Sequence, residues 1–230
     1  MAWIVAELHF GSLFSYRIPN ISPSFALTSP IPSPAAIRLA LVDTAIKIDG
    51  RVESGIEIFE LVKKLPMEIE PPERVVILKF FIKRLKPSKN QDSSFEESFG
   101  IREYCHFYGP MKVYLQAEEE SKRLEQIFRH LRRLGTSDSL LSCRTMVRAE
   151  GPDPRLIAKL LHEVKPEAEN FTRRPVVSLN EIREDACFSQ VNPYEKGRGN
   201  PFAQKTYILP LQEIKRGENF VIYRIAPFSV

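Results

Sequence analysis

Hydrophobic positions along the first 50 residues change from a strand pattern to a helical one. Residues 2–10 are rich in branched and aromatic side chains without a helix breaker, which predicts a strand. The run that starts at Ser33 and Pro34 is apolar on most helical faces, which predicts a helix buried on most sides. Ser33 is a favourable N-cap, Pro34 suits the first turn, and Asp49-Gly50 predicts the end.

The middle of the chain continues to alternate between strands and helices. The apolar density of 74–85 predicts a central strand buried on much of both faces. With the helix over 54–64 set aside, the order strand, helix, strand, strand, helix, strand is the ferredoxin-like βαββαβ pattern, so an α+β fold is expected. The remaining predicted elements are a loop or hairpin tip over 86–100, a strand pair over 101–116, a helix over 118–134 and a strand over 140–149.

The chain changes character after residue 150, so we predict a ferredoxin-like domain over 1–150 and a β-rich extension over 151–230. In the extension the patterns predict a short amphipathic helix over 154–164 and a strand after Pro175. They also predict a basic loop over 191–203 and a terminal β-hairpin formed by 207–214 and 219–225.

Composition narrows the class of protein without naming a function. The 33 basic and 29 acidic residues give a net charge of +4, which does not by itself require a nucleic-acid partner. Three widely spaced cysteines without metal-ligand spacing predict a reduced, cytoplasmic protein with buried thiols and no metal or other cofactor. No signal peptide and no membrane-spanning run is expected.

A distinctive motif connects the first strand to the first helix. It consists of an aromatic and basic strand end, a proline-rich loop and the start of the helix. Its residues are Gly11, Phe14, Ser15, Tyr16, Arg17, Pro19, Thr28, Ser29, Pro30, Pro32, Ser33, Pro34 and Arg38. This combination resembles the N-terminal signature of the Cas-five family, the RAMP-type subunits of CRISPR type I effector complexes (Cascade). Leu39 stands where that family often has a glycine.

The resemblance implies a RAMP fold and a non-enzymatic, RNA-binding function in antiviral defence. Such a subunit would hold the 5′ handle of the crRNA and cap the filament of backbone subunits. Its implied partners are the crRNA, the backbone RAMP subunit and the large subunit of the complex, with no membrane.

Basic residues around the motif are the first candidates for RNA contacts. Arg17 and Arg38 flank the proline-rich loop and are expected to converge on one anion, beside Tyr16, which could stack a base. Arg38 near a core requires an anionic partner, which is either a carboxylate or an RNA phosphate. The complete set of predicted RNA-binding residues is Tyr16, Arg17, Ser33, Arg38, Arg144, Lys196 and Arg198.

One of these predictions has a simpler alternative, and one further group of arginines is not predicted to contact RNA. The loop that contains Lys196 and Arg198 could grip phosphates, or it could be an ordinary solvated loop. The arginines near the end of helix 118–134 complement its negative end, so its exposed face is expected to be ordinary rather than a nucleic-acid groove.

The strand that contains Tyr104, His106 and Tyr108 offers a second candidate surface. Alternation places these three side chains on one face, which could stack bases or could be a half-solvated sheet face. Together with Lys112 they also form the nearest match to a metal-independent endoribonuclease site, since such residues suit acid–base cleavage at a 2′-hydroxyl. Processing of precursor crRNA is therefore the alternative function.

Overall fold

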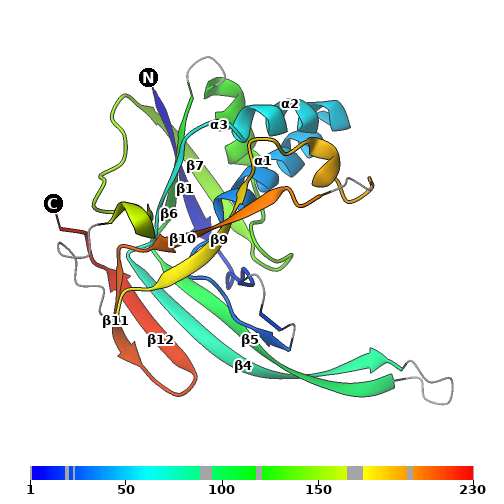
Figure 1. Ribbon diagram of the computed structural model, residues 1–230, viewed down its shortest axis with the longest axis vertical. Helices are drawn as coiled ribbons and strands as arrows, with labels where there is room; N and C mark the ends of the chain where they lie inside the picture. Colours follow the sequence, from blue (N-terminus) through cyan, green and yellow to red (C-terminus); the bar gives the residue numbers. More distant parts are fainter. Residues whose placement is uncertain are drawn as a thin grey trace.

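The structure, a computed structural model, describes residues 2–18, 21–22, 24–88, 95–117, 121–164, 173–195 and 199–229. Within these residues the chain forms three β-sheets and three α-helices (Figure 1). An α+β fold was predicted, and the mixture of helices and sheets is confirmed.

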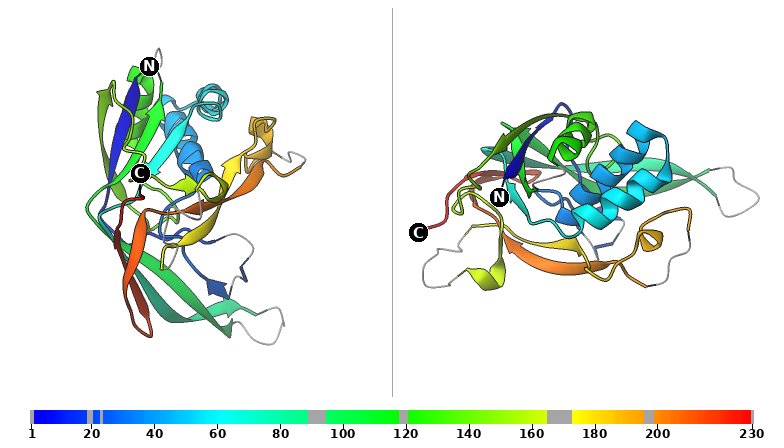
Figure 2. Two further views of the ribbon diagram at one scale, coloured as in Figure 1. Left: turned by 60° about the vertical axis from the view of Figure 1, so that its left-hand side comes forward. Right: turned by 90° about the horizontal axis from the view of Figure 1, so that it is seen from above.

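The first sheet has four antiparallel strands in the order β3-β6-β1-β7. These strands are β1 (Trp3–Phe10), β3 (Met67–Glu70), β6 (Met111–Gln116) and β7 (Leu141–Arg148). The helices α1 (Pro34–Asp49), α2 (Val52–Val62) and α3 (Ser121–His130) lie beside it (Figure 2). Ile4, Ala6 and Leu8 of β1 are fully buried at alternate positions, so one face of the sheet belongs to the core.

Helix α1 begins and ends as its sequence predicts. The Ser33 hydroxyl accepts a hydrogen bond from the Ala36 amide at 3.1 Å. Gly50 adopts a left-handed backbone with φ of 68°, and its amide donates to the Ile46 carbonyl at 2.7 Å. The helix contacts α2, α3 and β9 (Val176–Ile182), which explains why it is apolar around most of its circumference.

The second sheet has five strands in the order β11-β12-β4-β5-β2. They are β11 (Leu211–Arg216), β12 (Phe220–Ile225), β4 (Arg74–Pro87), β5 (Phe95–Tyr108) and β2 (Phe25–Ala26). The polar segment 86–100 was predicted as a loop or hairpin tip, and its described residues extend the long β4–β5 hairpin. The hairpin projects away from the helices (Figure 1).

Two predictions about strand β4 were wrong. The strand lies in the second sheet, so the four-stranded sheet takes β3 as the strand that follows the helices. Its distal half is exposed instead of buried, because β12 pairs with β4 only as far as Leu78 and β2 reaches β5 only at Ile101 and Arg102. Beyond those points, among the described residues, the two strands form a ribbon on their own.

The third sheet has the order β8-β10-β9, with β8 (Lys159–Leu160) and β10 (Phe202–Ile208). Two short 3₁₀ helices, η1 (Leu161–Glu163) and η2 (Phe188–Gln190), flank it. The predicted helix over 154–164 does not form. The Ala158 amide donates instead to the Ile69 carbonyl at 2.8 Å, which fixes this segment to the edge strand β3.

The terminal hairpin was predicted correctly in β11 and β12, but Tyr207 and Ile208 belong to β10 in another sheet. Strand β12 pairs along β4, so the five-stranded sheet contains strands from both sides of residue 150. Of the three thiols that were expected to be buried, Cys105 is buried, Cys143 is half-buried and Cys187 is exposed.

A cluster of charged side chains connects the third sheet to the rest of the protein. Glu68 on β3 lies near Glu163 on η1 and Glu181 on β9. The pKa of Glu68 is raised to about 7, mainly by burial and in addition by the two neighbouring carboxylates. The Tyr207 hydroxyl donates to Glu181 at 2.6 Å. Glu68 is therefore held in its neutral form at pH values where an ordinary glutamate is ionised.

We expect Glu68→Gln to stabilise the protein above pH 7. The folded-state pKa of Glu68 is raised, so its contribution is most favourable at low pH and is lost as the pH rises from about 4.5 through about 7. Glutamine stays neutral throughout, so the melting temperature of the variant relative to wild type should increase from pH 5 to pH 8. Glu218→Gln, at an exposed turn position, is the matched control and should show no such trend. A constant difference across this range would contradict the assignment.

Candidate nucleic-acid interface

The segment around the proline-rich loop is fixed by backbone hydrogen bonds on two sides. Phe14 exchanges two hydrogen bonds with Cys105 of β5, at 2.8 and 2.7 Å. The Ser29 amide donates to the Tyr16 carbonyl at 2.9 Å, and the Tyr16 amide donates to the Thr28 hydroxyl at 2.9 Å. The rings of Phe10, Phe14 and Phe107 contact one another with centroids 5.0–5.3 Å apart. The motif therefore connects β1, β5 and α1 rigidly.

Tyr16 and Ser33 are brought together, as members of one predicted site. The Ser33 hydroxyl donates to the Tyr16 hydroxyl at 2.8 Å while it caps α1. Burial raises the pKa of the Tyr16 phenol, and the hydrogen bond from Ser33 acts in the opposite direction. Ser33 is fully buried, whereas Tyr16 is half-buried and lines a surface cavity. Of the two, only Tyr16 is accessible to a ligand.

Arg17 and Arg38 have different surroundings. Arg17 is exposed, and within the described residues its guanidinium has no carboxylate partner. Arg38 is only 7 % exposed and donates to the carbonyl of Val62 at the end of α2. Burial lowers the pKa of Arg38, and the nearby charge of Glu181 acts in the opposite direction. Of the two alternatives for Arg38, this geometry favours a partner within the protein.

The other predicted basic residues lie away from the motif. Arg144 is exposed on β7, where its register partner on β1 is Glu7. Lys196 and Arg198 lie outside the described residues. These three positions stay predictions as RNA contacts.

The second candidate surface is larger than its sequence pattern suggested. Pairing of β4 with β5 places a set of aromatic and basic side chains on one face of the hairpin. We name this the basic-aromatic face, and it comprises Arg74, Phe80, Arg84, Lys86, Arg102, Tyr104, His106 and Tyr108.

Ring contacts order the proximal part of the basic-aromatic face. Arg74 lies over the Tyr108 ring at 5.5 Å, and His106 meets the same ring edge-on at 4.8 Å. Phe80 and Tyr104 meet edge-on at 5.7 Å. Tyr108 and Phe80, which are 50 % and 42 % exposed, offer flat apolar area next to positive charge.

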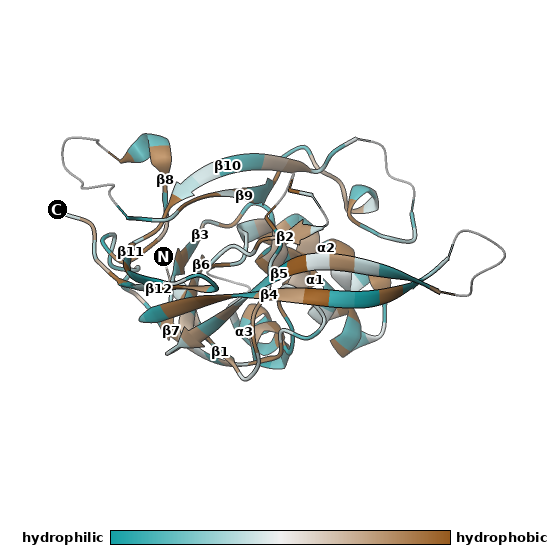
Figure 3. Cartoon of the chain, turned by 90° about the horizontal axis from the view of Figure 1, so that it is seen from below, coloured by the Kyte–Doolittle hydropathy of each residue, from teal (hydrophilic) through white to brown (hydrophobic). Residues whose placement is uncertain are grey.

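Cations dominate the distal part of the basic-aromatic face. A cavity of about 180 Å³ lies beside Ser24, and Arg84, Lys86 and Arg102 line it. The register partner of Lys86 is Glu96, the one carboxylate that the described hairpin contributes to this face. Figure 3 shows hydrophilic and hydrophobic residues following one another along the hairpin.

The four residues of the possible nuclease site are not assembled. Tyr104, His106 and Tyr108 share the basic-aromatic face, but Lys112 belongs to β6 in the four-stranded sheet. The Lys112 ammonium is bound to Glu70 at 2.8 Å, and Tyr114 donates to the same carboxylate at 2.7 Å. The described residues also contain no cluster of three or more side chains suited to hold a metal ion.

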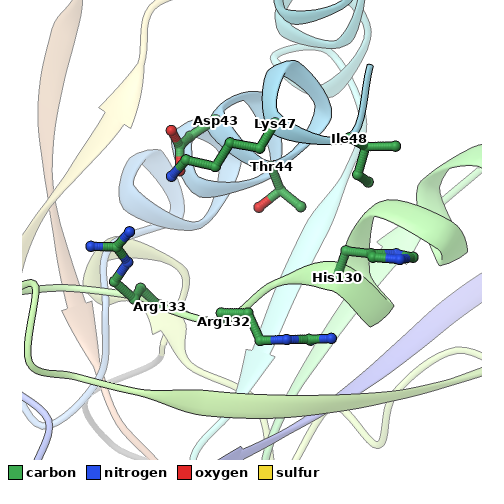
Figure 4. Close-up of a pocket in the computed structure, with 7 residues that line it drawn as sticks. All are labelled: Asp43, Thr44, Lys47, Ile48, His130, Arg132 and Arg133. Atoms are coloured by element: carbon green, nitrogen blue, oxygen red, sulfur yellow. The ribbon is translucent and has the colours of Figure 1, made fainter. Parts of the chain in front are cut away.

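Sequence reasoning missed a cavity between α1 and the end of α3 (Figure 4). Helix α3 ends at His130, four residues before its predicted end, so Arg132 and Arg133 follow the helix. Arg132 does donate to the carbonyls of Arg129 and Leu131, as expected for a cation at a helix end. The tertiary contact of α1 with α3, which no local pattern encodes, creates the cavity.

Comparison with known proteins identifies relatives of the whole chain. A curated protein of Archaeoglobus fulgidus, described as CRISPR-associated protein Cas5, is 36% identical over 229 residues, which cover 98% of this chain and 99% of the relative. No protein-family model matches the chain.

Two solved structures show more distant similarity. One is a CRISPR protein from Archaeoglobus fulgidus, with a TM-score of 0.47, 14% identity, and coverage of 98% of this chain and 92% of that one. The other is a chain of a CRISPR RNA-guided surveillance complex, with a TM-score of 0.41, 14% identity and coverage of 99% and 91%.

The full-length identity defines the class: this is a CRISPR-associated protein. Within that class, the chain belongs to the Cas5 family, which confirms the resemblance found in its N-terminal motif. No helix among the described residues has the length and apolar character needed to cross a membrane.

Arg17 and Arg38 form a matched pair for a mutational test. Arg38→Ala should lower the free energy of unfolding by about 1.5–3 kcal/mol, the range for hydrogen bonds made by a charged group, and should leave the salt dependence of RNA binding unchanged. Arg17→Ala should change stability by less than about 0.5 kcal/mol, and should lower the salt slope by about 0.7 if Arg17 contacts a phosphate. Denaturant melts and RNA titrations at several salt concentrations measure both. A reduced slope for folded Arg38→Ala would show that Arg38 reaches RNA.

Proposed function

We propose that this protein is a non-enzymatic, RNA-binding subunit of a CRISPR type I effector complex. It would hold the 5′ handle of the crRNA and cap the filament of backbone subunits. The observation that carries the proposal is the basic-aromatic face of the β4–β5 hairpin in a chain of the Cas5 family.

The chemistry of this face suits single-stranded RNA. Unpaired bases stack on aromatic side chains and on guanidinium planes, and phosphates are neutralised by lysine and arginine. Tyr108 is half exposed and lies under Arg74, so one position offers both a ring and a cation. The distal Arg84, Lys86 and Arg102 supply charge to the adjoining phosphates.

We also propose that residues 1–150 form a ferredoxin-like RAMP domain and that 151–230 are its extension. The order β3-β6-β1-β7, with every pair antiparallel and a helix in each connection to the outer strands, supports this arrangement. The β4–β5 hairpin is then an insertion between the second and third strands of the pattern.

The opposite face of the hairpin supports a protein partner. Phe81 and Phe99 stack there at 5.6 Å, and Phe81 is 71 % exposed. Leu85 and Phe95, at 66 % and 60 % exposed, extend the same face toward the tip. Exposed apolar side chains in such a group are typical of an interaction surface. The backbone RAMP subunit and the large subunit are the proposed partners.

Aromatic truncation tests the proposal directly. We expect Tyr108→Ala to weaken binding of single-stranded RNA by roughly 1–3 kcal/mol, the cost of one lost stacking platform. The matched control is Tyr194→Ala, because Tyr194 is 95 % exposed and lies on a separate segment. Fluorescence anisotropy with labelled repeat RNA measures both affinities. Equal affinities of the two variants and wild type would overturn the role of this face.

Metal-independent cleavage of precursor crRNA is the second candidate function, and the presence of His106 between two tyrosines favours it. The engagement of Lys112 by Glu70 in another sheet is the observation against it. We expect purified protein incubated with repeat RNA in EDTA to give no discrete product on a denaturing gel. One product that disappears in His106→Ala would establish the nuclease instead.

A further inference from the structure

A positively charged groove runs along the side of α1 that faces the end of α3. It consists of two adjoining cavities of about 380 and 390 Å³, which share Asp43, Lys47 and Arg133. Each volume is in the range of small-ligand sites, about 300–1,000 Å³. The first cavity is also lined by Thr44, Ile48, His130 and Arg132, and the second by Tyr16, Ala36, Ala40, Leu134, Gly135, Thr136 and Ser137.

Positive charge in the groove exceeds negative charge. Asp43 is the one carboxylate in its lining, and it forms an ion pair with Lys47 one turn along α1. Arg132 and Arg133 remain, and within the described residues neither guanidinium meets a carboxylate. In Figure 4 the Arg133 side chain points toward the Asp43–Lys47 pair across the cavity. An anion in this groove would therefore meet cations from both walls.

His130 adds a further polar group to the same wall. Its Nδ1 lies 2.8 Å from the Gln126 carbonyl, which can only accept, so Nδ1 carries the proton. Nε2 is thereby left available for a ligand. Figure 4 shows His130 and Arg132 extending in the same direction from the end of α3.

The groove is fixed before any ligand arrives. The Thr136 amide donates to the Ser15 carbonyl at 3.0 Å, and the Ser15 amide donates to the Ser139 hydroxyl at 3.0 Å. Gly135 has φ of 91°, and a Cβ there would lie 2.5 Å from the Ser15 carbonyl oxygen. These contacts fix the 134–139 wall against the strand end that carries Tyr16, so binding would cost little ordering entropy.

We propose that this groove is a second RNA-binding site, which holds the phosphates of a short single-stranded segment against Lys47, Arg132 and Arg133. Tyr16, half-buried at the other end, offers an aromatic edge to one base of that segment. The groove is separate from the basic-aromatic face, but the same short segment joins them: Tyr16 lines the groove and Phe14 pairs with β5. This inference rests on the proposed RNA-binding function and extends it to a surface on the helical side of the molecule.

Paired charge removal tests the groove in the full-length protein. The double variant Arg132→Gln/Arg133→Gln should lower the salt slope of binding to a single-stranded RNA oligonucleotide by about 1.4, which is 0.7 for each phosphate contact. At 0.1 M salt this corresponds to roughly 25-fold weaker binding. The control Lys64→Gln/Lys205→Gln removes the same charge from exposed positions outside the groove and should leave the slope nearly unchanged. Thermal melts check that both variants fold.

The outcomes separate this inference from the function on which it rests. If the wild-type protein binds RNA and the Arg132→Gln/Arg133→Gln variant keeps the wild-type salt slope, the groove is not an RNA-binding site, while the proposed RNA-binding function stands. An equal loss of slope in both double variants would also overturn the groove site, because the effect would then be one of net charge. If wild type shows no salt-dependent RNA binding, the proposed function fails and the groove fails with it.

Discussion

The buried guanidinium of Arg38 holds together parts of the chain that are far apart in sequence. It extends from α1 to the carbonyl at the end of α2, and it lies near Glu181 of β9. A cation in this position must be neutralised inside the protein, since its desolvation would otherwise cost several kcal/mol. The third sheet therefore brings more than apolar contact to α1. It supplies the Glu181 carboxylate, which opposes the lowering of the Arg38 pKa by burial.

The second constraint is the fixed segment around Phe14 and Ser15. Its backbone pairs with β5 on one side and with the wall that follows α3 on the other. The three clustered phenylalanines fill the space between the two larger sheets. As a result, the proximal part of the basic-aromatic face and the groove along α1 are held at a constant separation by a few residues of the N-terminal motif.

Local signals in the sequence predicted the elements that depend on short-range chemistry. The cap at Ser33, the stop at Gly50 and the break between β5 and β6 follow from hydrogen bonding and backbone geometry within a few residues. The partners of each strand in the sheets were harder to predict, because the apolar run of β4 suits both a buried strand and a projecting ribbon with one apolar face. The same limit applied to the candidate site. Arg17 and Arg38 are close in sequence, yet only the packing of α2 and β9 determines that Arg38 points inward.

The projecting part of the β4–β5 hairpin affects how RNA and a partner protein would bind to this subunit. An isolated two-stranded ribbon is marginally stable in water, and this one exposes Phe81, Leu85 and Phe95 without a third strand among the described residues. Its direction in the free subunit is therefore weakly determined, whereas RNA on one face and a protein on the other would fix it. Under the proposed function, the ligand that binds first would lower the entropic cost for the second, so RNA and the partner protein would bind the hairpin cooperatively.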